Sequence, residues 1–478
     1  MSVKQVPHRE KLYVDGEWRA TDDWLKITDL ADGGEFSQIA AASPSDAKDA
    51  IAAAQQAEAG LRKMTVVQRA DWLESIADGI EEKKEILTET IVREAGKPIS
   101  SAQDEVDAAA ERFRRAVEEA RSIKGEYIEG TTESHEGWRA IVRREPVGTV
   151  LCITPYNYPL STTALQVAPA LAAGNAVILK PATKTPVSAA ILAEIIVETA
   201  PNTPDGSFGF VPGHGSDIGD TLAGDNRLNA IAMTGSSDAG KHVASVSGMV
   251  ELHMELGGNA PAVIFPDADL ETAVSGCASG SFKYAGQRCS AISRLLVHKD
   301  IHDEVVDRIH SELNDWTAGD LFDSETTIGP LISVEQADWV KELVEDAVNK
   351  GATLVDGGER DGRFFEPTLL ADVPHDARII HEEQFGPVAA VTTFEDESEA
   401  LDIANNSDLG LDASVFTSDY DQAMRVANKL EAGSIRINGP PSHGLGDIPF
   451  GGVNESGIGR EGIDYTIESF LSHKSIIL

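Results

Sequence analysis

One of the three cysteines, Cys289, has neighbours suited to nucleophilic chemistry. It lies in the segment GQRCS (286–290), between glycine and polar residues. A thiolate is a strong nucleophile, and an adjacent cation such as Arg288 favours the thiolate form. Cys152 lies within the apolar run VLCIT and Cys277 among small residues, so we expect both to be buried and unreactive. Three cysteines in 478 residues also exclude a disulfide scaffold.

A glutamate, Glu255, is a candidate general base. It lies near the end of the strand-like run 250–256, and one residue, Leu256, separates it from two glycines. A carboxylate at the end of a buried strand is costly unless it is paired or used in chemistry. A surface or helix-capping acid is the alternative interpretation. His242 and His253 have no convincing set of cysteine or histidine partners, so no metal site is predicted.

Two glycine-containing turns could bind a phosphate group. The segment MTGSSDAG (233–240) follows a predicted strand and enters a helix, and Gly213 closes an earlier strand. A glycine such as Gly235 lets the backbone approach a phosphate, and a helix N-terminus offers free N–H groups. Neither turn contains the full G-x-G-x-x-G dinucleotide fingerprint. An ordinary turn therefore remains the alternative at each place.

The elements that must position these residues alternate between strand and helix. The segment 11–20 predicts a hairpin, and residues 123–146 predict two polar, exposed strands. Helices are predicted over 44–58, 66–95, 100–122, 160–173, 186–200, 216–223, 270–285, 302–315 and 335–350. Apolar strands are predicted over 147–154, 176–180, 208–211, 229–233, 250–256, 262–265 and 294–297. This alternation predicts a doubly wound parallel α/β sheet, with a second α/β unit beginning near residue 256.

The stretch from residue 146 to 179 carries no charged side chain. Such a stretch is long enough for a membrane helix. However, Pro155, Pro159, Pro169 and Gly174 interrupt it, with polar residues between them. Unpaired backbone groups at such breaks are not tolerated in lipid. We therefore interpret the stretch as a buried strand, turn, helix and strand.

The charge of the chain excludes several classes of partner. It has 79 acidic and 40 basic residues, for a formal net charge of −39. An exposed nucleic-acid site or docking on an anionic bilayer needs a basic face. The acids are spread along the chain, which favours adaptation to high salt over an ordinary solvated surface. The N-terminus has no apolar signal segment, so a cytoplasmic location is expected.

Seven short segments, in this order, resemble the NAD(P)-dependent aldehyde dehydrogenase superfamily over nearly the whole chain. They are TPYNYP (154–159), KPATKTP (180–186), TGS (234–236), ELGG (255–258), GQRC (286–289), EQFGP (383–387) and PFGG (449–452). Each segment is a weak signal alone. Their order, with the acid of ELGG preceding the thiol of GQRC, is specific.

The resemblance implies a role for each candidate residue. Cys289 would attack the aldehyde, Glu255 would activate the water that cleaves a thioester, and Asn157 would stabilise the oxyanion. The substrate would contact Tyr158, Arg288 and Phe450. Glu461 would orient or relay protons to the base, or simply begin a helix. The implied NAD or NADP cofactor would be held by Thr154, Pro155, Lys180, Thr183, Gly213, Gly235, Ser236, Leu256, Gly257, Glu383 and Phe385.

The resemblance also implies three parts. Residues 1–125 and 147–257 would form a Rossmann-like cofactor domain, and 258–455 a catalytic domain. Residues 126–146 and 456–478 would form a small β element that assembles a homodimer or homotetramer. The apolar end Ser475–Leu478 is expected to pair with a sheet edge, such as that of a neighbouring subunit.

Departures from the family pattern bear on cofactor and substrate. Thr183 occupies a place where many NAD-preferring members carry an acid, which favours NADP. Asn454 replaces a common lysine, and we interpret it as neutral surface variation. Arg288 and Tyr158 resemble the non-phosphorylating glyceraldehyde-3-phosphate dehydrogenase branch, but the loop 439–448 offers only His443 where an arginine would grip phosphate. Lactaldehyde and semialdehydes therefore stay open as substrates.

Two other functions remain as alternatives. A CoA-acylating semialdehyde dehydrogenase would use the same thiol, although such members tend to lack the glutamate at position 255. A non-catalytic nucleotide-binding descendant of the fold would be expected to lose Cys289 or Glu255.

Overall fold

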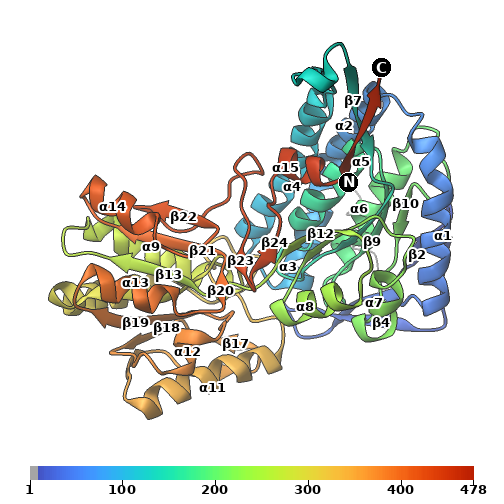
Figure 1. Ribbon diagram of the computed structural model, residues 1–478. Helices are drawn as coiled ribbons and strands as arrows, with labels where there is room; N and C mark the ends of the chain where they lie inside the picture. The colour runs from blue at the N-terminus through green and yellow to red at the C-terminus, as the bar shows by residue number, and fades with distance from the viewer. Residues whose placement is uncertain (1–8) are drawn as a thin grey trace.

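Two large sheets organise the chain, and they lie in separate bodies joined side by side (Figure 1). The computed structural model describes residues 9–478. The expectation about a signal segment rests largely on residues outside this range. The first sheet has eight strands in the order β24-β12-β11-β8-β9-β10-β2-β3, and the second has seven in the order β15-β18-β19-β14-β13-β21-β22. Both are predominantly parallel, which confirms the predicted α/β class.

The first sheet contains five central parallel strands. They are β8 (Thr149–Ile153), β9 (Ala176–Lys180), β10 (Phe208–Phe210), β11 (Ala230–Thr234) and β12 (Glu251–Glu255). The predicted hairpin forms one edge as β2 (Leu12–Val14) and β3 (Glu17–Arg19), and β24 (Gly457–Ile458) forms the other. Its helices are α1 (Pro44–Leu61), α2 (Val66–Glu82), α3 (Lys84–Ala95), α4 (Ile99–Ser122), α5 (Ser161–Ala173), α6 (Val187–Glu198), α7 (Gly215–Ala223) and α8 (Ser237–Val246).

The predicted helix 66–95 is wrong as a single helix. It is two helices, α2 and α3, separated at Lys83, whose backbone leaves the helical region (φ −95°, ψ 15°). The highly charged run EEKKE (81–85) has no apolar side chain to bury. The break turns α3 so that apolar side chains of both helices enter one core.

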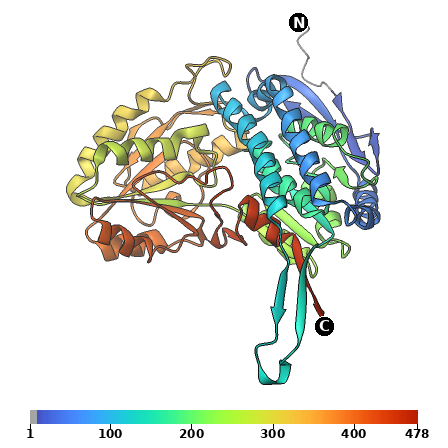
Figure 2. The same cartoon turned by 90° about the horizontal axis from the view of Figure 1, so that it is seen from above.

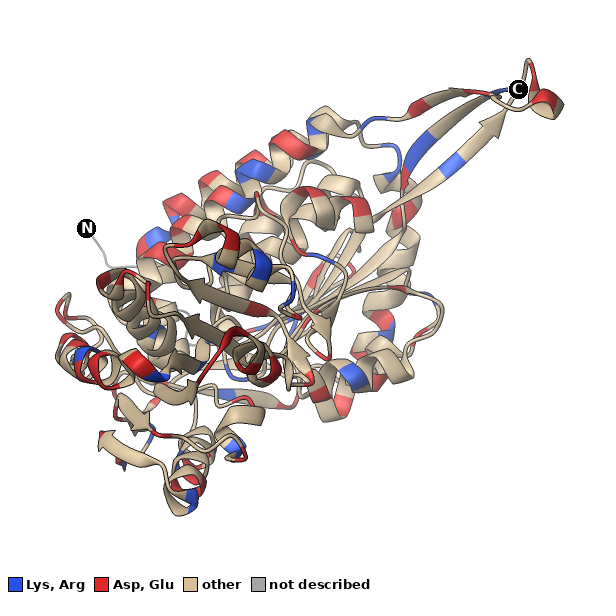
Figure 3. Ribbon diagram, turned by 60° about the vertical axis from the view of Figure 1, so that its left-hand side comes forward, with Lys and Arg blue, Asp and Glu red and all other residues tan. Residues whose placement is uncertain are grey.

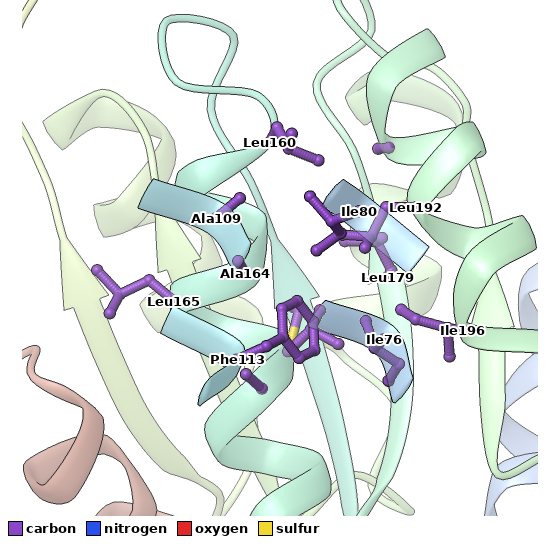
Figure 4. Packing of buried hydrophobic residues seen from close by; sticks show 14 of the residues in the cluster. Ile76, Ile80, Ala109, Phe113, Leu160, Ala164, Leu165, Leu179, Leu192 and Ile196 are labelled. Carbon is purple, nitrogen blue, oxygen red and sulfur yellow. The ribbon is translucent and has the colours of Figure 1, made fainter. Parts of the chain in front are cut away.

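The uncharged stretch 146–179 forms β8, α5 and β9 inside the first body. Gly174 ends α5 in the left-handed region (φ 92°), as predicted for a helix terminus. Figure 4 shows the packing beside it, where Ile76 and Ile80 of α2 and Phe113 of α4 meet Leu179 of β9. Over residues 9–478, no helix is long and apolar enough to cross a membrane.

The second sheet contains six parallel strands and one antiparallel strand. These are β13 (Ala260–Ile264), β14 (Ile292–His298), β18 (Thr368–Ala371), β19 (Val388–Phe394), β21 (Asp412–Phe416), β22 (Ser434–Ile437) and the antiparallel β15 (Thr353–Asp356). Its helices are α9 (Leu270–Phe282), α10 (His302–Glu312), α11 (Val334–Lys350), α12 (Arg378–His381), α13 (Glu397–Asn405) and α14 (Tyr420–Ala427). The helices predicted to end at 285 and 315 end three residues earlier, because short 3₁₀ turns follow them.

A three-stranded antiparallel sheet projects from the first body (Figure 2). It consists of β6 (Glu126–Glu129), β7 (Arg139–Pro146) and β25 (Leu471–Ile477), which follows α15 (Ile463–Ser469). The apolar chain end pairs with β7 of its own chain, from Leu471–Pro146 to Ile477–Ala140. Tyr127, Ile141 and Ile477 on this sheet are exposed. The sheet therefore presents apolar side chains and two outer strands to its surroundings.

Acidic side chains are distributed over both bodies rather than gathered in one place (Figure 3). Many helices carry several of them on their outer faces. Adaptation to high salt stays a prediction.

Candidate active site

The carboxyl ends of three adjacent strands bring the predicted cofactor and base residues together. In the parallel pairs, Met233 of β11 is opposite Ile153 of β8, and Thr234 is opposite Glu255 of β12. Thr154 and Gly235, which follow β8 and β11, therefore lie at the same sheet edge as Glu255. This edge faces the second body and is where ligands bind in open α/β sheets.

Cys289 follows a backbone segment with unusual conformation. Tyr284 and Ala285 have positive φ angles of 55° and 50°, and Gly286 continues the turn at 68°. A Cβ atom at Gly258 would lie 2.2 Å from the carbonyl oxygen of Cys289, so only glycine lets the two backbones approach this closely. The backbone of Cys289 is thereby held beside Gly258 of the ELGG segment.

Asn157 points at the segment that carries the thiol. Its Nδ2 donates a hydrogen bond to the carbonyl oxygen of Gln287, at 2.9 Å, and its side chain is buried. Gln287 is fixed in turn, because its Oε1 accepts from the N–H of Ile332 at 2.8 Å. The amide of Asn157 has a second N–H that this bond does not use, and that hydrogen is available to an oxyanion.

Glu255 is a buried carboxyl group without a hydrogen-bond partner among the described residues. Its exposed fraction is 2%, and no hydrogen bond of normal geometry reaches either carboxyl oxygen, although the backbone N–H of Glu461 is near enough to lower its pKa. Burial raises its pKa well above the ordinary value, nearby Glu461 raises it further, and Arg460 opposes the rise. A Cβ at Gly451 would lie 2.6 Å from its Oε1. A buried, unpaired acid of this kind is typical of proton-transfer groups.

The environment of Cys289 favours the neutral thiol. Burial raises its pKa, and the acids Asp412 and Glu255 add to that rise. The prediction that Arg288 favours the thiolate is not confirmed. The Arg288 guanidinium instead donates to the carbonyl oxygens of Ser279 and Gly280, at 3.3 and 2.5 Å. The thiol therefore needs a base to remove its proton, and Glu255 is close enough to influence it.

Glu383, which the family resemblance implies for the nicotinamide ribose of the cofactor, lies beside the ELGG segment. Its Oε1 accepts from the N–H of Gly258 at 2.9 Å, and burial raises its pKa to about 7. A Cβ at Gly257 would lie 2.9 Å from the other Glu383 oxygen and 3.0 Å from Ser237 Oγ. The ring of Phe385 packs against Tyr156, with centroids 5.9 Å apart.

The adenosine end also has the features of a dinucleotide site. Burial lowers the pKa of Lys180 to about 8, and its Nζ donates to the Pro181 carbonyl oxygen at 3.4 Å, with no carboxylate partner among residues 9–478. Thr154 Oγ1 is buried without a partner. Thr183 Oγ1 donates to the carbonyl oxygen of Gly213, at 3.2 Å. The predicted cofactor residues therefore fit a dinucleotide, with an ammonium and a hydroxyl group available to it.

The remaining predicted cofactor residues are held in place by helix capping and by packing. Ser236 caps α8, since its hydroxyl accepts from the N–H of Ala239 at 3.4 Å. Leu256 packs against α8, where a Cβ at Gly240 would lie 2.4 Å from it. Pro155 follows Thr154 in the loop leading to Asn157 and is half-buried.

The substrate side contains groups that the sequence did not single out. Arg112 of α4 is a partly buried cation whose Nη1 donates to the carbonyl oxygen of Ser161 at 2.5 Å and whose buried Nε has no partner among the described residues. It acts electrostatically on Tyr158 and Glu461. In the sequence, Arg112 lies in ERFRRA, which looks like the charged outer face of an ordinary helix. The sequence pattern therefore gives no signal that would single it out. The predicted residue Tyr158 is partly buried and lies near it.

Phe450 and His443 also meet here. Their rings stack at 3.8 Å with an interplanar angle of 29°. His443 Nε2 lies 2.9 and 3.0 Å from the carboxylate oxygens of Asp412. His443 lowers the pKa of Glu461, whereas burial raises that pKa to about 7. His443 and Phe450 therefore lie close to Glu461, on the substrate side of the site. Among residues 9–478, no group of three potential metal ligands was found.

A model of the aldehyde dehydrogenase family matches residues 18–476. The chain belongs to the aldehyde dehydrogenase family. An NADP-dependent glyceraldehyde-3-phosphate dehydrogenase from Streptococcus equinus is 37% identical over 98% of each chain. A lactaldehyde dehydrogenase from Methanocaldococcus jannaschii is 35% identical over 98% of this chain and all of its own.

The fold of this aldehyde dehydrogenase agrees with solved structures. It superposes with a TM-score of 0.96 on the NADP complex of an NADP-dependent glyceraldehyde-3-phosphate dehydrogenase from Bacillus halodurans, which is 36% identical and matches over 98% of this chain and 99% of its own. The dehydrogenase class predicted from the seven segments is therefore confirmed.

Proposed function

We propose that this aldehyde dehydrogenase oxidises a short anionic aldehyde to a carboxylic acid with NADP or NAD, through a thioester on Cys289. The observation that carries the proposal is Glu255, a buried carboxyl group with no hydrogen-bond partner beside a thiol that needs a base. When bound, the nicotinamide ring accepts the hydride from the aldehyde carbon.

The protein's own groups carry the first half of the reaction. Loss of the thiol proton generates the thiolate, which forms a carbon–sulfur bond with the aldehyde carbon. Negative charge then develops on the former aldehyde oxygen. The free N–H of Asn157 and the backbone N–H of Cys289 are the proposed donors to it. One donor of this kind is typically worth ~10²–10³ in rate.

Glu255 carries the second half. Its carboxylate takes a proton from a water molecule as the water oxygen attacks the thioester carbon. The carbon–sulfur bond then breaks, the acid leaves, and the sulfur regains a proton. General-base catalysis typically supplies ~10²–10⁴ in rate. Glu461, which raises the pKa of Glu255, is the proposed route for the proton to leave.

The substrate proposal rests on two guanidinium groups that are partly buried. Arg112 and Arg288 both act electrostatically on Tyr158, and the Nε of each lacks a partner. Glu461 and Glu105 act electrostatically on Arg112, but a buried N–H without a hydrogen-bond partner is costly and favours an acceptor such as an anionic ligand. Two similar relatives are named as an NADP-dependent glyceraldehyde-3-phosphate dehydrogenase and a 3-sulfolactaldehyde dehydrogenase. We therefore favour a terminal phosphate, sulfonate or carboxylate on the aldehyde.

A panel of aldehydes tests this proposal. Short aldehydes with a phosphate, sulfonate or carboxylate group are compared with neutral ones of the same length, by kcat/KM. We expect at least a tenfold preference for an anionic member, and Arg112→Gln should remove most of it. Equal use of charged and neutral aldehydes would exclude the anion site while leaving the dehydrogenase function intact.

Thr183 predicts the choice of cofactor. Its hydroxyl lies beside Gly213, and Lys180 supplies a buried cation near the expected ribose site. A hydroxyl tolerates the 2′-phosphate of NADP, and a lysine forms charge-assisted hydrogen bonds of ~1.5–3 kcal/mol with it. We expect efficient use of NADP, and Thr183→Glu should lower the NADP/NAD ratio of kcat/KM at least tenfold, about 1.4 kcal/mol.

Thr183→Ser is the matched control, because it keeps the hydroxyl and should leave the ratio nearly unchanged. If the wild type does not use NADP, or if Thr183→Glu leaves the NADP/NAD ratio of kcat/KM unchanged, Thr183 does not determine the choice of cofactor.

Assembly and location complete the proposal. Residues 1–125 with 147–257 form the proposed cofactor domain, and 258–455 the catalytic domain. We propose that 126–146 and 456–478 assemble a homodimer or homotetramer, because their sheet leaves two outer strands with exposed apolar residues. We also propose that the protein acts in the cytoplasm. Light scattering is the direct check, and a mass of one chain at working concentration would contradict the assembly.

A further inference from the structure

A buried lysine, Lys97, touches both segments that carry the proposed catalytic groups. It lies between α3 and α4. Its Nζ lies 3.5 Å from the ring centroid of Tyr158 and 4.4 Å from that of Tyr284. Tyr158 directly follows Asn157, and Tyr284 begins the turn that leads to Cys289. The ammonium therefore joins a loop of the first body to a loop of the second through two cation–π contacts.

A buried carboxylate, Glu105 of α4, holds Lys97 in place. Lys97 Nζ lies 2.5 Å from Glu105 Oε2, and the two side chains are 1% and 0% exposed. The other oxygen of Glu105 accepts from the N–H groups of Leu160 and Ser161, at 3.0 and 3.1 Å. One carboxylate thus fixes both the lysine and the end of the loop that contains Asn157 and Tyr158.

The second loop is supported from the same place. The hydroxyl of Tyr284 donates to the carbonyl oxygen of Ala95 at 2.8 Å, two residues before Lys97. Tyr284 and Ala285 have left-handed backbones, which non-glycine residues keep only when their surroundings hold them. The lysine and the Ala95 carbonyl are therefore part of what holds the turn before Cys289.

We propose that Lys97, held by Glu105, is a positioning residue that aligns Asn157 with Cys289 across the two bodies. Burial of a charged pair is costly and rarely a gain in stability over apolar packing, so its place between two active-site loops indicates a role in geometry. Burial lowers the pKa of Lys97 to about 8, whereas Glu105 opposes this shift. The proposal rests on the roles proposed above for Asn157 and Cys289.

The test compares Lys97→Met with a matched control on the same two helices. Lys84 and Asp107 also join α3 to α4, but at the surface, with Nζ–Oδ distances of 2.5 and 2.7 Å. We expect Lys97→Met to slow the NADPH burst at least tenfold and Lys84→Met to leave it unchanged. The affinity for NADP and the rate of Cys289 alkylation by iodoacetamide should stay within about twofold of the wild type. Lys97→Arg, which keeps the charge, should recover part of the loss.

A double-mutant cycle separates positioning from a general structural role. If Lys97 acts through Asn157, Lys97→Met should have little further effect in an Asn157→Ala background, because the aligned donor is already absent. A full additional loss in that background, or a normal burst in folded Lys97→Met, overturns the proposal. If Lys97→Met does not fold, the isosteric Glu105→Gln is used in the same cycle. Absence of an NADPH burst in Glu255→Gln, where water attack is slow, would contradict the thioester mechanism itself, which is a different result.

Discussion

Replacement of Cys289 by alanine is expected to reduce aldehyde oxidation by roughly 10⁵–10⁶-fold, the scale on which enzymes lose a covalent nucleophile. The thiol is the atom that bonds to the substrate, and the described residues around it offer no second nucleophile in its place. NADP affinity should change little, because the groups proposed to hold the cofactor lie on the sheet edge and on Glu383. Steady-state NADPH formation and cofactor titration measure the two effects.

Cys277→Ala is the control for this variant. Cys277 is fully buried in α9, so its loss should cost stability while kcat/KM stays close to that of the wild type. Appreciable turnover in Cys289→Ala would place the nucleophile elsewhere and remove the thioester from the mechanism.

Glu255→Gln is expected to separate the two halves of the reaction. Acylation can still release one equivalent of NADPH per active site, although removal of the thiol proton is slower if Glu255 performs it. Water attack loses its base, so steady-state turnover should fall by ~10²–10⁴-fold. The readout is a stoichiometric burst followed by very slow turnover. A variant that turns over at the wild-type rate shows that another group activates the water.

The raised pKa of Glu255 adds a dependence on pH. The base must be a carboxylate to accept a proton from water, so the wild-type rate of deacylation should rise as pH passes upward through that raised pKa. Glu461 helps to raise the pKa of Glu255, so Glu461→Gln should lower that pKa and shift the acidic limb of the pH–rate profile to lower pH. Glu255→Gln should lack this limb. A deacylation rate that is flat from pH 5 to 9 in the wild type would show that Glu255 does not control the step.

Local patterns predicted most of the fold because each buried strand and helix carries its own signal. The strand Ala176–Lys180 is found with the predicted bounds, and Gly174 ends the preceding helix. The sequence does not predict the break at Lys83, because the segments on both sides of it favour helix. The direction in which α3 leaves the break depends on the core that α2 and α3 share. The partner of the apolar chain end was left open, since strand pairing depends on contacts far apart in sequence.

The site was predictable where short motifs carry it and not where only the folded chain assembles it. Cys289, Glu255 and Asn157 lie in recognisable segments. Arg112 and Lys97 lie in or beside helix α4, among charged residues that resemble a solvated surface, and only burial distinguishes them. The expectation for Arg288 failed because its guanidinium turns back to the carbonyl groups of α9.

Peptide mass spectrometry of Glu255→Gln is the most direct test of the central claim, that a thioester forms on Cys289. The variant is mixed with an aldehyde substrate and excess NADP, quenched in acid and digested. The account predicts a mass gain equal to the aldehyde less two hydrogen atoms, confined to the peptide that contains Cys289 and released by hydroxylamine. An NADPH burst without this adduct, or an adduct on another residue, would contradict it.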